Sequence, residues 1–400
     1  MRHLPGLLLV AACVVLAACD GQRAISSDPT STSVPPPAPS ISIPAGQPIT
    51  IGVSVALSGD QVGLGTDIAD AADLAAADFG GALKSHPIVI KRVDDGCTDA
   101  EKAVAVADEL ISDRTLVGVI GPMCTTGSQA ASDEYEQAGI VHISPSATRV
   151  DLSEKGEAYF FRTTWRDDVQ ARLQASHASG ALQAKTAILI DDGDPYGKGL
   201  ADAFAARFSE SGGQVLVRER IARGDVDFAP LAREIMSAAP DLVVFEGLNP
   251  EGALIARALR EGTFTGAFMA PDGVLNIRDF LQAAGPSAEG AILTGGPTPD
   301  DAFNARFNER FQRLPSTPFV LQSHDAVTLL LRAIDGVARD DAGTLTIERA
   351  ALLSQLRETP FDGLTGQISF DERGDRRGDR APEVGLRIYE VRDGRFEPIE

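Results

Sequence analysis

A repeated alternation of strand, loop and helix constrains the fold of this chain more than any other sequence feature. Residues 116–121 form a short apolar run rich in β-branched residues, long enough for a buried strand and too short for a helix. The run is followed by a hydroxyl-rich loop (122–128), a helical segment (129–137), a second short strand (140–143) and a second hydroxyl-rich loop (144–148). In open parallel sheets, ligands bind outside the carboxyl ends of the strands. The stretch is therefore predicted to hold a small polar molecule by its carboxylate.

The same alternation extends in both directions along the chain. Before it, strands are predicted at 49–55 and 88–93, with helices capped by Thr66 and Asp99. After a connecting segment at 160–168, the alternation restarts at residue 186 and continues to residue 293. Two such runs predict an α/β fold of two doubly wound parallel-sheet lobes. From residue 299 the pattern becomes helical, with helices at 301–313, 319–338 and 346–357 and late strands at 367–370 and 385–391. The charged run between those strands, 371–378, is predicted to be a solvated turn.

Length and charge narrow the functional classes. Four hundred residues favour two or three domains rather than one. The formal net charge of −21 argues against a nucleic-acid partner, because phosphate binding requires clustered lysines and arginines. Nucleophile elbows and metal-spaced histidine pairs are missing from the sequence, so no enzymatic activity, cofactor or metal is expected. A Gly63-x-Gly65 pair lacks the third glycine of a dinucleotide loop.

The first residues are predicted to be an export signal. Residues 7–16 form an apolar segment too short to span a bilayer. The following residues 16–19 resemble the lipobox of bacterial lipoproteins, which implies cleavage after residue 18 and acylation of Cys19. An ordinary secretory signal is the alternative. Residues 19–48 are rich in serine and proline, and we expect them to form a tether.

Two cysteines remain for the folded part of the chain, Cys97 and Cys124. An even number of cysteines in an exported protein favours a disulfide. The alternatives are two free thiols or metal ligands, although no histidine or cysteine cluster accompanies the pair. A disulfide would fix the first hydroxyl-rich loop to the loop after the preceding strand.

Several short motifs resemble the substrate-binding subunit of branched-chain amino-acid ABC transporters, the Leu/Ile/Val-binding protein family of type I periplasmic binding proteins. The similarity covers about residues 48–400 and rests on the order and spacing of the motifs rather than on any one of them. The motifs lie at 94–97, 103–107, 119–124, 144–148, 161–164, 194–197, 270–274 and 370–375. The resemblance implies two lobes joined by three crossovers, with a ligand cleft that closes on binding.

The resemblance also implies ligand contacts. Thr125 should bind the ligand carboxylate, and Thr148 should contact both carboxylate and ammonium. The Ser146 carbonyl should accept an ammonium proton, with Ala147 beside it. Asp167, in an Asp-x-x-Gln pattern completed by Gln170, adds a negative charge.

Other implied contacts lie where this chain departs from the family. Asp272 stands where the family has a longer glutamate facing the ammonium, and Tyr196 should close over the ligand. Leu64 and Leu248 replace aromatic residues. Trp165 replaces a small residue beside the cleft, where it would either contact the ligand or pack between the lobes.

Together these features predict an extracytoplasmic, lipid-anchored solute-binding protein. It would capture a branched-chain or related amino acid by cleft closure and deliver it to an ABC importer. The alternative is a ligand-sensing regulator, or a binder of amides or urea with the same fold. The expected partners are the small-molecule ligand, the permease subunits and the lipid bilayer through Cys19, and the protein itself is expected to be a monomer. The predicted lobes comprise residues 49–165 with 297–370, and 166–296 with 371–400.

Overall fold

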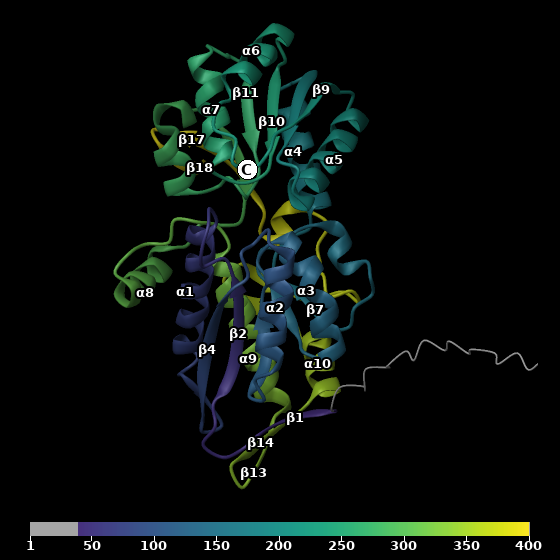
Figure 1. The fold of residues 1–400 in the computed structure, drawn as a ribbon, viewed down its shortest axis with the longest axis vertical. Coiled ribbons are helices and arrows are strands. Elements are labelled where there is room, and N and C mark those ends of the chain that lie inside the picture. The colour runs from purple at the N-terminus through teal and green to yellow at the C-terminus, as the bar shows by residue number, and fades with distance from the viewer. Residues whose placement is uncertain (1–38, 400) are drawn as a thin grey trace, which may run out of the picture. The chain divides into compact units, whose positions relative to one another are not determined.

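The structure is a computed structural model that describes residues 39–399. The predicted signal peptide (1–18), Cys19 and most of the predicted tether lie outside these residues. Two mainly parallel sheets, each covered by helices on both faces, organise the described part of the chain (Figure 1). The predicted α/β class is confirmed. No helix within residues 39–399 is long and apolar enough to cross a membrane.

The first sheet contains the strands that end in the two hydroxyl-rich loops. Its order is β3 (Ala82–Leu83), β4 (His86–Asp94), β2 (Ile49–Val55), β5 (Leu116–Ile120), β6 (His142–Ser144) and β7 (Phe160–Arg162). All neighbours are parallel except β3 and β4. The carboxyl ends of β5 and β6 are adjacent, because Ile120 pairs with Ile143, and the two loops therefore start side by side.

Helices cover both faces of this sheet because its strands are apolar on both sides. One face packs against α2 (Ala100–Ile111) and α3 (Thr125–Ala138), and the other against α1 (Val62–Asp78) and α9 (Val320–Val337). Asp99 caps α2 as predicted, since its carboxylate accepts a hydrogen bond from the Lys102 amide at 3.0 Å. Thr66 does not cap α1. The helix begins one turn earlier, after Gln61.

The second sheet repeats this plan in the later part of the chain. Its order is β18 (Arg395–Pro398), β17 (Arg387–Arg392), β12 (Ile292–Gly295), β11 (Ala267–Ala270), β10 (Leu242–Glu246), β8 (Thr186–Asp191) and β9 (Gln214–Arg220). One face packs against α4 (Asp167–Gly180) and α5 (Pro195–Glu210), and the other against α6 (Ala229–Ala238), α7 (Glu251–Glu261), η2 (Ile277–Gln282) and η3 (Gly285–Ala288). The strands β17 and β18, from the chain end, are antiparallel to the rest.

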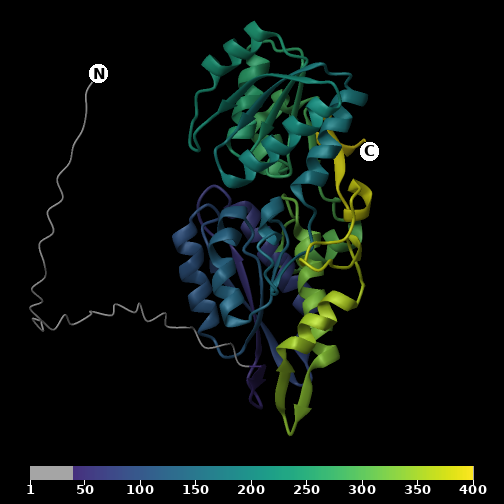
Figure 2. The ribbon, with the colours of Figure 1, turned by 90° about the vertical axis from the view of Figure 1, so that its right-hand side faces the viewer.

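Within residues 39–399 the chain passes between the two sheets three times, after β7, after β12 and before β17. Figure 2 shows the last passage in yellow along one side of the sheets. It is tied to the first passage by a buried ion pair, since Arg162 Nε lies 2.6 Å from Asp375. Arg166 approaches the same carboxylate at 2.9 Å. Burial opposes ionisation, but the positive charges of Arg162 and Arg166 and the Ser153 hydrogen bond lower the pKa of Asp375.

This ion pair corrects one expectation from the sequence. The charged run 371–378 is not a solvated turn throughout, because Asp375 and Arg376 are buried. Arg376 donates hydrogen bonds to the carbonyls of Thr163 and Thr365, at 3.1 and 2.8 Å. The run therefore fastens the segments that pass between the two sheets, by contacts with residues far away in the sequence.

Two further expectations about local structure were wrong. Part of the predicted tether is a strand, β1 (Ser40–Ile43), which pairs with β14 (Thr344–Glu348) and buries Ile41 and Ile43. The predicted helix at 346–357 starts later, as α10 (Arg349–Glu358), because its first residues belong to β14. The remaining elements are α8 (Asp301–Phe311), β13 (Arg339–Asp341), β15 (Phe361–Gly363), β16 (Gly366–Ile368), η1 (Val150–Ser153) and η4 (Ala381–Val384).

Candidate functional site

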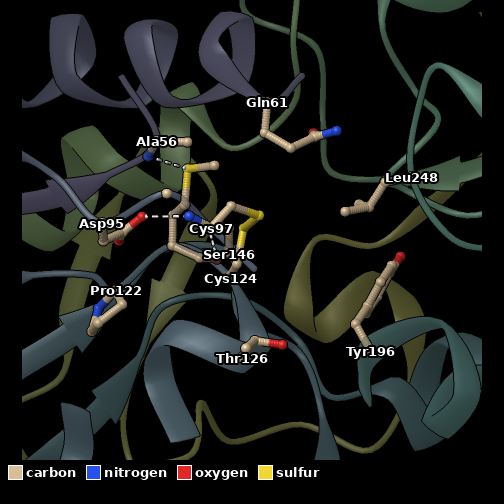
Figure 3. The surroundings of a disulfide bond; sticks show 12 residues. Ala56, Gln61, Asp95, Cys97, Pro122, Cys124, Thr126, Ser146, Tyr196 and Leu248 are labelled. Atoms are coloured by element: carbon tan, nitrogen blue, oxygen red, sulfur yellow. Dashed lines mark hydrogen bonds between the residues drawn. A yellow bond between two sulfur atoms is a disulfide. The ribbon is translucent and has the colours of Figure 1, made fainter. Parts of the chain in front are cut away.

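The first hydroxyl-rich loop is held by the Cys97–Cys124 disulfide, which confirms the predicted pairing (Figure 3). Cys124 is the N-cap residue of α3, and no side chain among the described residues caps this helix. Asp95 fixes the other half of the crosslink, because its carboxylate accepts a hydrogen bond from the Cys97 amide at 2.9 Å. Thr125 follows as the first residue of α3. It therefore lies at a helix N-terminus whose amide groups and dipole favour an anion.

The second hydroxyl-rich loop is fastened to the first by its own serines. The Ser144 hydroxyl donates to the Pro122 carbonyl and the Ser146 hydroxyl to the Met123 carbonyl, both at 2.7 Å. The Ala147 amide in turn donates to Ser144 Oγ at 3.0 Å. These bonds join the two loops into one continuous wall.

The opposite wall comes from the second sheet and its helices. The Tyr196 hydroxyl donates to the Asp272 carboxylate at 3.1 Å, and both side chains are buried. Leu248, from the loop after β10, lies beside them, and Figure 3 shows Tyr196 and Leu248 facing the disulfide from the other side. Gly273 leaves them room, because a Cβ there would lie 2.7 Å from Leu248 Cδ2 and 3.2 Å from Tyr196 Cε1.

A small pocket, with a cavity volume of about 30 Å³, separates the two walls. Its lining includes the predicted ligand residues Leu64, Thr125, Ser146, Tyr196, Leu248 and Asp272. It also includes residues that the sequence did not single out as ligand contacts: Cys97, Met123, Cys124, Asp194, Gly273 and Phe319. The disulfide, which was predicted only as a crosslink, is thus also part of the pocket wall.

Four of the predicted ligand residues are buried behind this lining: Ala147, Thr148, Trp165 and Asp167. The Ala147 carbonyl accepts a hydrogen bond from Arg162 at 3.2 Å. The Thr148 hydroxyl and the Asp167 carboxylate are buried close to each other, and neither has another side-chain hydrogen-bond partner within residues 39–399. Because buried polar atoms are nearly always paired, these two groups can accept a further polar partner.

Burial raises the pKa values of the acids in this region. Removal from water raises the pKa of Asp272 to about 6. The same effect, reinforced by the negative charge of Asp272, raises the pKa of Asp167 to about 7. Because these two groups form no ion pair with any described residue, a cation that entered the pocket would favour their ionised forms.

Trp165 packs rather than lining the pocket. Its indole Nε1 donates to the Gln170 side chain at 2.7 Å, and its ring stacks on Phe319 with centroids 5.3 Å apart. Phe319 itself lines the pocket, in a left-handed backbone conformation with φ of 72°. Such a conformation is rare for a bulky residue and clusters at functional sites. Nothing in the local sequence signals this conformation.

Three hydrogen bonds cross between the elements of the two sheets at the rim of the pocket. The Thr126 hydroxyl donates to Asp194 at 3.0 Å, and the Gln61 amide donates to the Asn249 carbonyl at 2.8 Å. Arg149 donates to the Pro195 carbonyl at 3.0 Å. These bonds belong to the arrangement in which the two walls are close together. Among residues 39–399, no group of acids, histidines or cysteines has the geometry to hold a metal ion.

Comparison with known proteins agrees with this geometry. A family model described as periplasmic binding protein matches residues 48–395. The Leu/Ile/Val-binding protein of Escherichia coli is 30% identical over 341 residues, which cover 82% of this chain and 88% of that protein. An amino acid binding protein of Pseudomonas aeruginosa is 30% identical over 333 residues, which cover 82% of this chain and 87% of that protein. A branched-chain amino acid transporter substrate-binding protein of Streptococcus pneumoniae, solved with isoleucine, is 26% identical with a TM-score of 0.76, covering 88% and 98% of the two chains.

Proposed function

Because this chain belongs to the periplasmic binding protein family, we propose that it captures a branched-chain or related α-amino acid in its pocket and delivers it to an ABC importer. The observation that carries this proposal is the polarity of the pocket. The uncapped start of α3 lies on one wall and the buried Asp272 carboxylate on the other. An α-amino acid carries its ammonium and its carboxylate on the same carbon, and this pocket has a group of complementary charge for each of them.

The rest of the lining supports an apolar ligand side chain. Leu64, Met123, Leu248 and Phe319 contribute apolar surface, together with the disulfide. An aliphatic side chain of three or four carbons would gain about 0.8 kcal/mol for each buried methylene. The E. coli and S. pneumoniae relatives, whose names and ligand identify them as binders of aliphatic amino acids, support the same ligand class.

The proposal includes the predicted roles of residues behind the lining. Thr125 and Thr148 would hold the ligand carboxylate, the Ser146 carbonyl would accept an ammonium proton, and Asp272 with Asp167 would balance the ammonium charge. The lobes would meet at the pocket and close over the ligand, with Tyr196 as part of the closing wall. The lobe boundaries would be those predicted from the sequence, 49–165 with 297–370 and 166–296 with 371–400.

Export and anchoring complete the proposal. Cleavage before Cys19 and acylation of its thiol would tether the domain to the outer face of a cell membrane, close to the permease. Mass spectrometry of the membrane-extracted protein tests this point, since a diacylglyceryl modification on Cys19 is expected. A mature protein that starts elsewhere, without lipid, would contradict it.

Ligand capture is tested by native mass spectrometry of the gently purified domain, followed by thermal-shift assays. We expect leucine, isoleucine or valine to stabilise the domain, by about 2.7 kcal/mol at a ligand concentration 100 times the dissociation constant. Benzoate, the ligand of a structural neighbour from R. palustris, is the matched control because it has a carboxylate but no ammonium. Stabilisation by benzoate and by no α-amino acid would refute the amino-acid proposal.

A further inference from the structure

Glu246 is a buried acid that none of the proposed ligand contacts uses. It is the last residue of β10, where its neighbour across the sheet is Asp191. Side chains alternate along a strand, so Glu246 shares the face of Leu242 and Val244, which pack in the core under α4 and α5. The carboxyl of Glu246 therefore lies on a strand face whose preceding side chains, Leu242 and Val244, are apolar and buried. Its exposed fraction is 0%, no positive side chain pairs with it within residues 39–399, and the Gln174 amide of α4 is the neighbour that favours its ionised form.

Glu246 lies among other acids from every element packed around it. Asp272 follows β11, Asp167 begins α4 and Asp192 follows β8, and the negative charge of each opposes ionisation of Glu246. The negative charges of Asp272, Asp167 and Glu246 all raise the pKa of the Tyr196 hydroxyl, from α5, in addition to the effect of its burial. We call Asp167, Glu246 and Asp272 the carboxyl cluster. Burial, together with the charge of Asp272, raises the pKa of Glu246 well above its ordinary value.

The nearest arginines are already engaged elsewhere. Arg162, whose charge acts on Asp167, forms its ion pair with Asp375 at 2.6 Å. Arg223 lies 3.5 Å from Asp192 and 3.1 Å from Glu251. In the described chain, no ion pair therefore reaches the carboxyl cluster. Three buried carboxyls in one region cannot all be ionised without a cation, so the empty cluster must retain protons.

The ligand's ammonium changes this balance. It introduces a positive charge and three N–H donors beside Asp272, where the carboxyl cluster offers acceptor oxygens. Resting on the proposed function, we infer that capture of an amino acid releases a proton from the carboxyl cluster to solvent, and that Glu246 is the positioning residue that makes the release occur near neutral pH. The balance is simple: a carboxylic acid and an ammonium become a carboxylate–ammonium pair, and one proton leaves.

The consequence is a pH-dependent affinity. Release of one proton for each bound ligand makes the association constant rise about tenfold for each pH unit. Between about pH 5.5 and 7.5, free leucine remains zwitterionic, so the protein alone supplies the proton. Wild-type protein should therefore bind L-leucine at least tenfold more tightly at the upper end of this range.

Isothermal titration calorimetry with L-leucine tests the inference, in two buffers of different ionisation enthalpy at about pH 7. We expect release of about one proton by the wild type and less than half a proton by Glu246→Gln, with an affinity that varies less with pH. Glu157→Gln is the matched control, because Glu157 is also a buried acid with a raised pKa but lies beside α3, hydrogen-bonded to Ser132. It should behave as the wild type.

The outcomes separate this inference from the proposed function. Leucine binding by the wild type without proton release would overturn the inference and leave the proposed function standing. No binding of any α-amino acid would overturn both. Equal proton release by Glu246→Gln and wild type would reduce Glu246 to a structural role. If Glu246→Gln does not fold, the proton count of the wild type alone decides whether capture is proton-linked.

Discussion

The two walls of the pocket differ in how their buried polar groups are paired. On the wall of the first sheet, hydroxyls are paired within the protein: Ser144 and Ser146 bind the carbonyls of Pro122 and Met123. On the wall of the second sheet, Asp272, Asp167 and Glu246 are buried without a positive partner in the described chain, and neutral donors such as Tyr196 and Gln170 favour the ionised form of Asp272. The first wall thus has most of its hydroxyls paired, apart from Thr148, whereas the acids of the second wall have no positive partner in the described chain.

The two walls therefore contribute differently to binding: the first fixes the position of the α3 N-terminus, and the second contributes charge. A wall held by its own hydrogen bonds and a disulfide keeps the α3 N-terminus in a fixed position, which reduces the entropy lost on binding. A wall of uncompensated carboxyls is destabilising in the empty protein and becomes favourable only when a cation arrives. We therefore expect substitutions on the second wall to change affinity and pH dependence most, and substitutions on the first wall to have smaller effects.

The largest effect is expected for Asp272→Asn. Removing the charge opposite the ammonium should weaken leucine binding at least 100-fold, about 3 kcal/mol, because a buried charge loses its partner. Calorimetry provides the affinity. Asp202→Asn is the matched control, since Asp202 lies on α5 of the same lobe with its side chain 46% exposed. An affinity within threefold of the wild type would mean that the second wall does not select for charge.

Asp167→Asn should have the next largest effect. This effect is on the free energy of unfolding, which the substitution should increase. The folded pKa of Asp167, about 7, lies above its value in the unfolded chain. The unfolded chain therefore loses this proton first, and the folded state loses stability as the pH rises from about 4 to about 7. The variant should raise the free energy of unfolding of the empty protein by about 2 kcal/mol at about pH 8 and by little at about pH 5. Denaturant unfolding at both pH values measures this. A variant less stable at the higher pH would contradict the idea of stored charge repulsion.

Short-range patterns in the sequence predicted the sheets and the hydroxyl-rich loops, and the family resemblance supplied the predicted lining residues on both walls. Leu116–Ile120 is recognisable as a buried strand from its own residues, and Asp99 as a cap from its position. These features depend on neighbours within one turn or one strand. Some predicted ligand residues are buried behind the residues that line the pocket. No local sequence pattern distinguishes a residue that lines the pocket from one that lies behind it.

Features set by distant partners were not predictable. Asp375 is buried because Arg162, from β7, meets it across the fold. Phe319 enters the pocket because Trp165 stacks behind it, and β1 forms because β14 offers an edge. Glu246 directly follows the apolar run 242–245 in the sequence. Whether such an acid lies in a solvated loop or in a buried strand depends on the helices that cover it.

Thr148→Val tests the first wall directly. The hydroxyl is buried with no side-chain partner other than Asp167 in the described chain, and the substitution keeps the shape of the side chain. If the ligand uses this hydroxyl, affinity should fall at least tenfold, about 1.4 kcal/mol. Thr328→Val is the control, because the Thr328 hydroxyl bonds only to the His324 carbonyl within α9. Unchanged affinity in calorimetry would place the ligand away from the second hydroxyl-rich loop.

The smallest effect is expected where the two walls touch. The Thr126 hydroxyl donates to Asp194 at 3.0 Å, and Asp194 also accepts from the Tyr196 amide at 2.9 Å. Thr126→Ala removes a bond that joins the walls only when they are close, so it should weaken leucine binding two- to threefold, about 0.5 kcal/mol. Asp194→Ala should do more, because it also uncaps α5. The pH dependence of binding should be unchanged in Thr126→Ala, since the carboxyl cluster is intact. A loss larger than that of Asp272→Asn would reverse the comparison: contact between the walls, rather than charge on the second wall, would then control ligand capture.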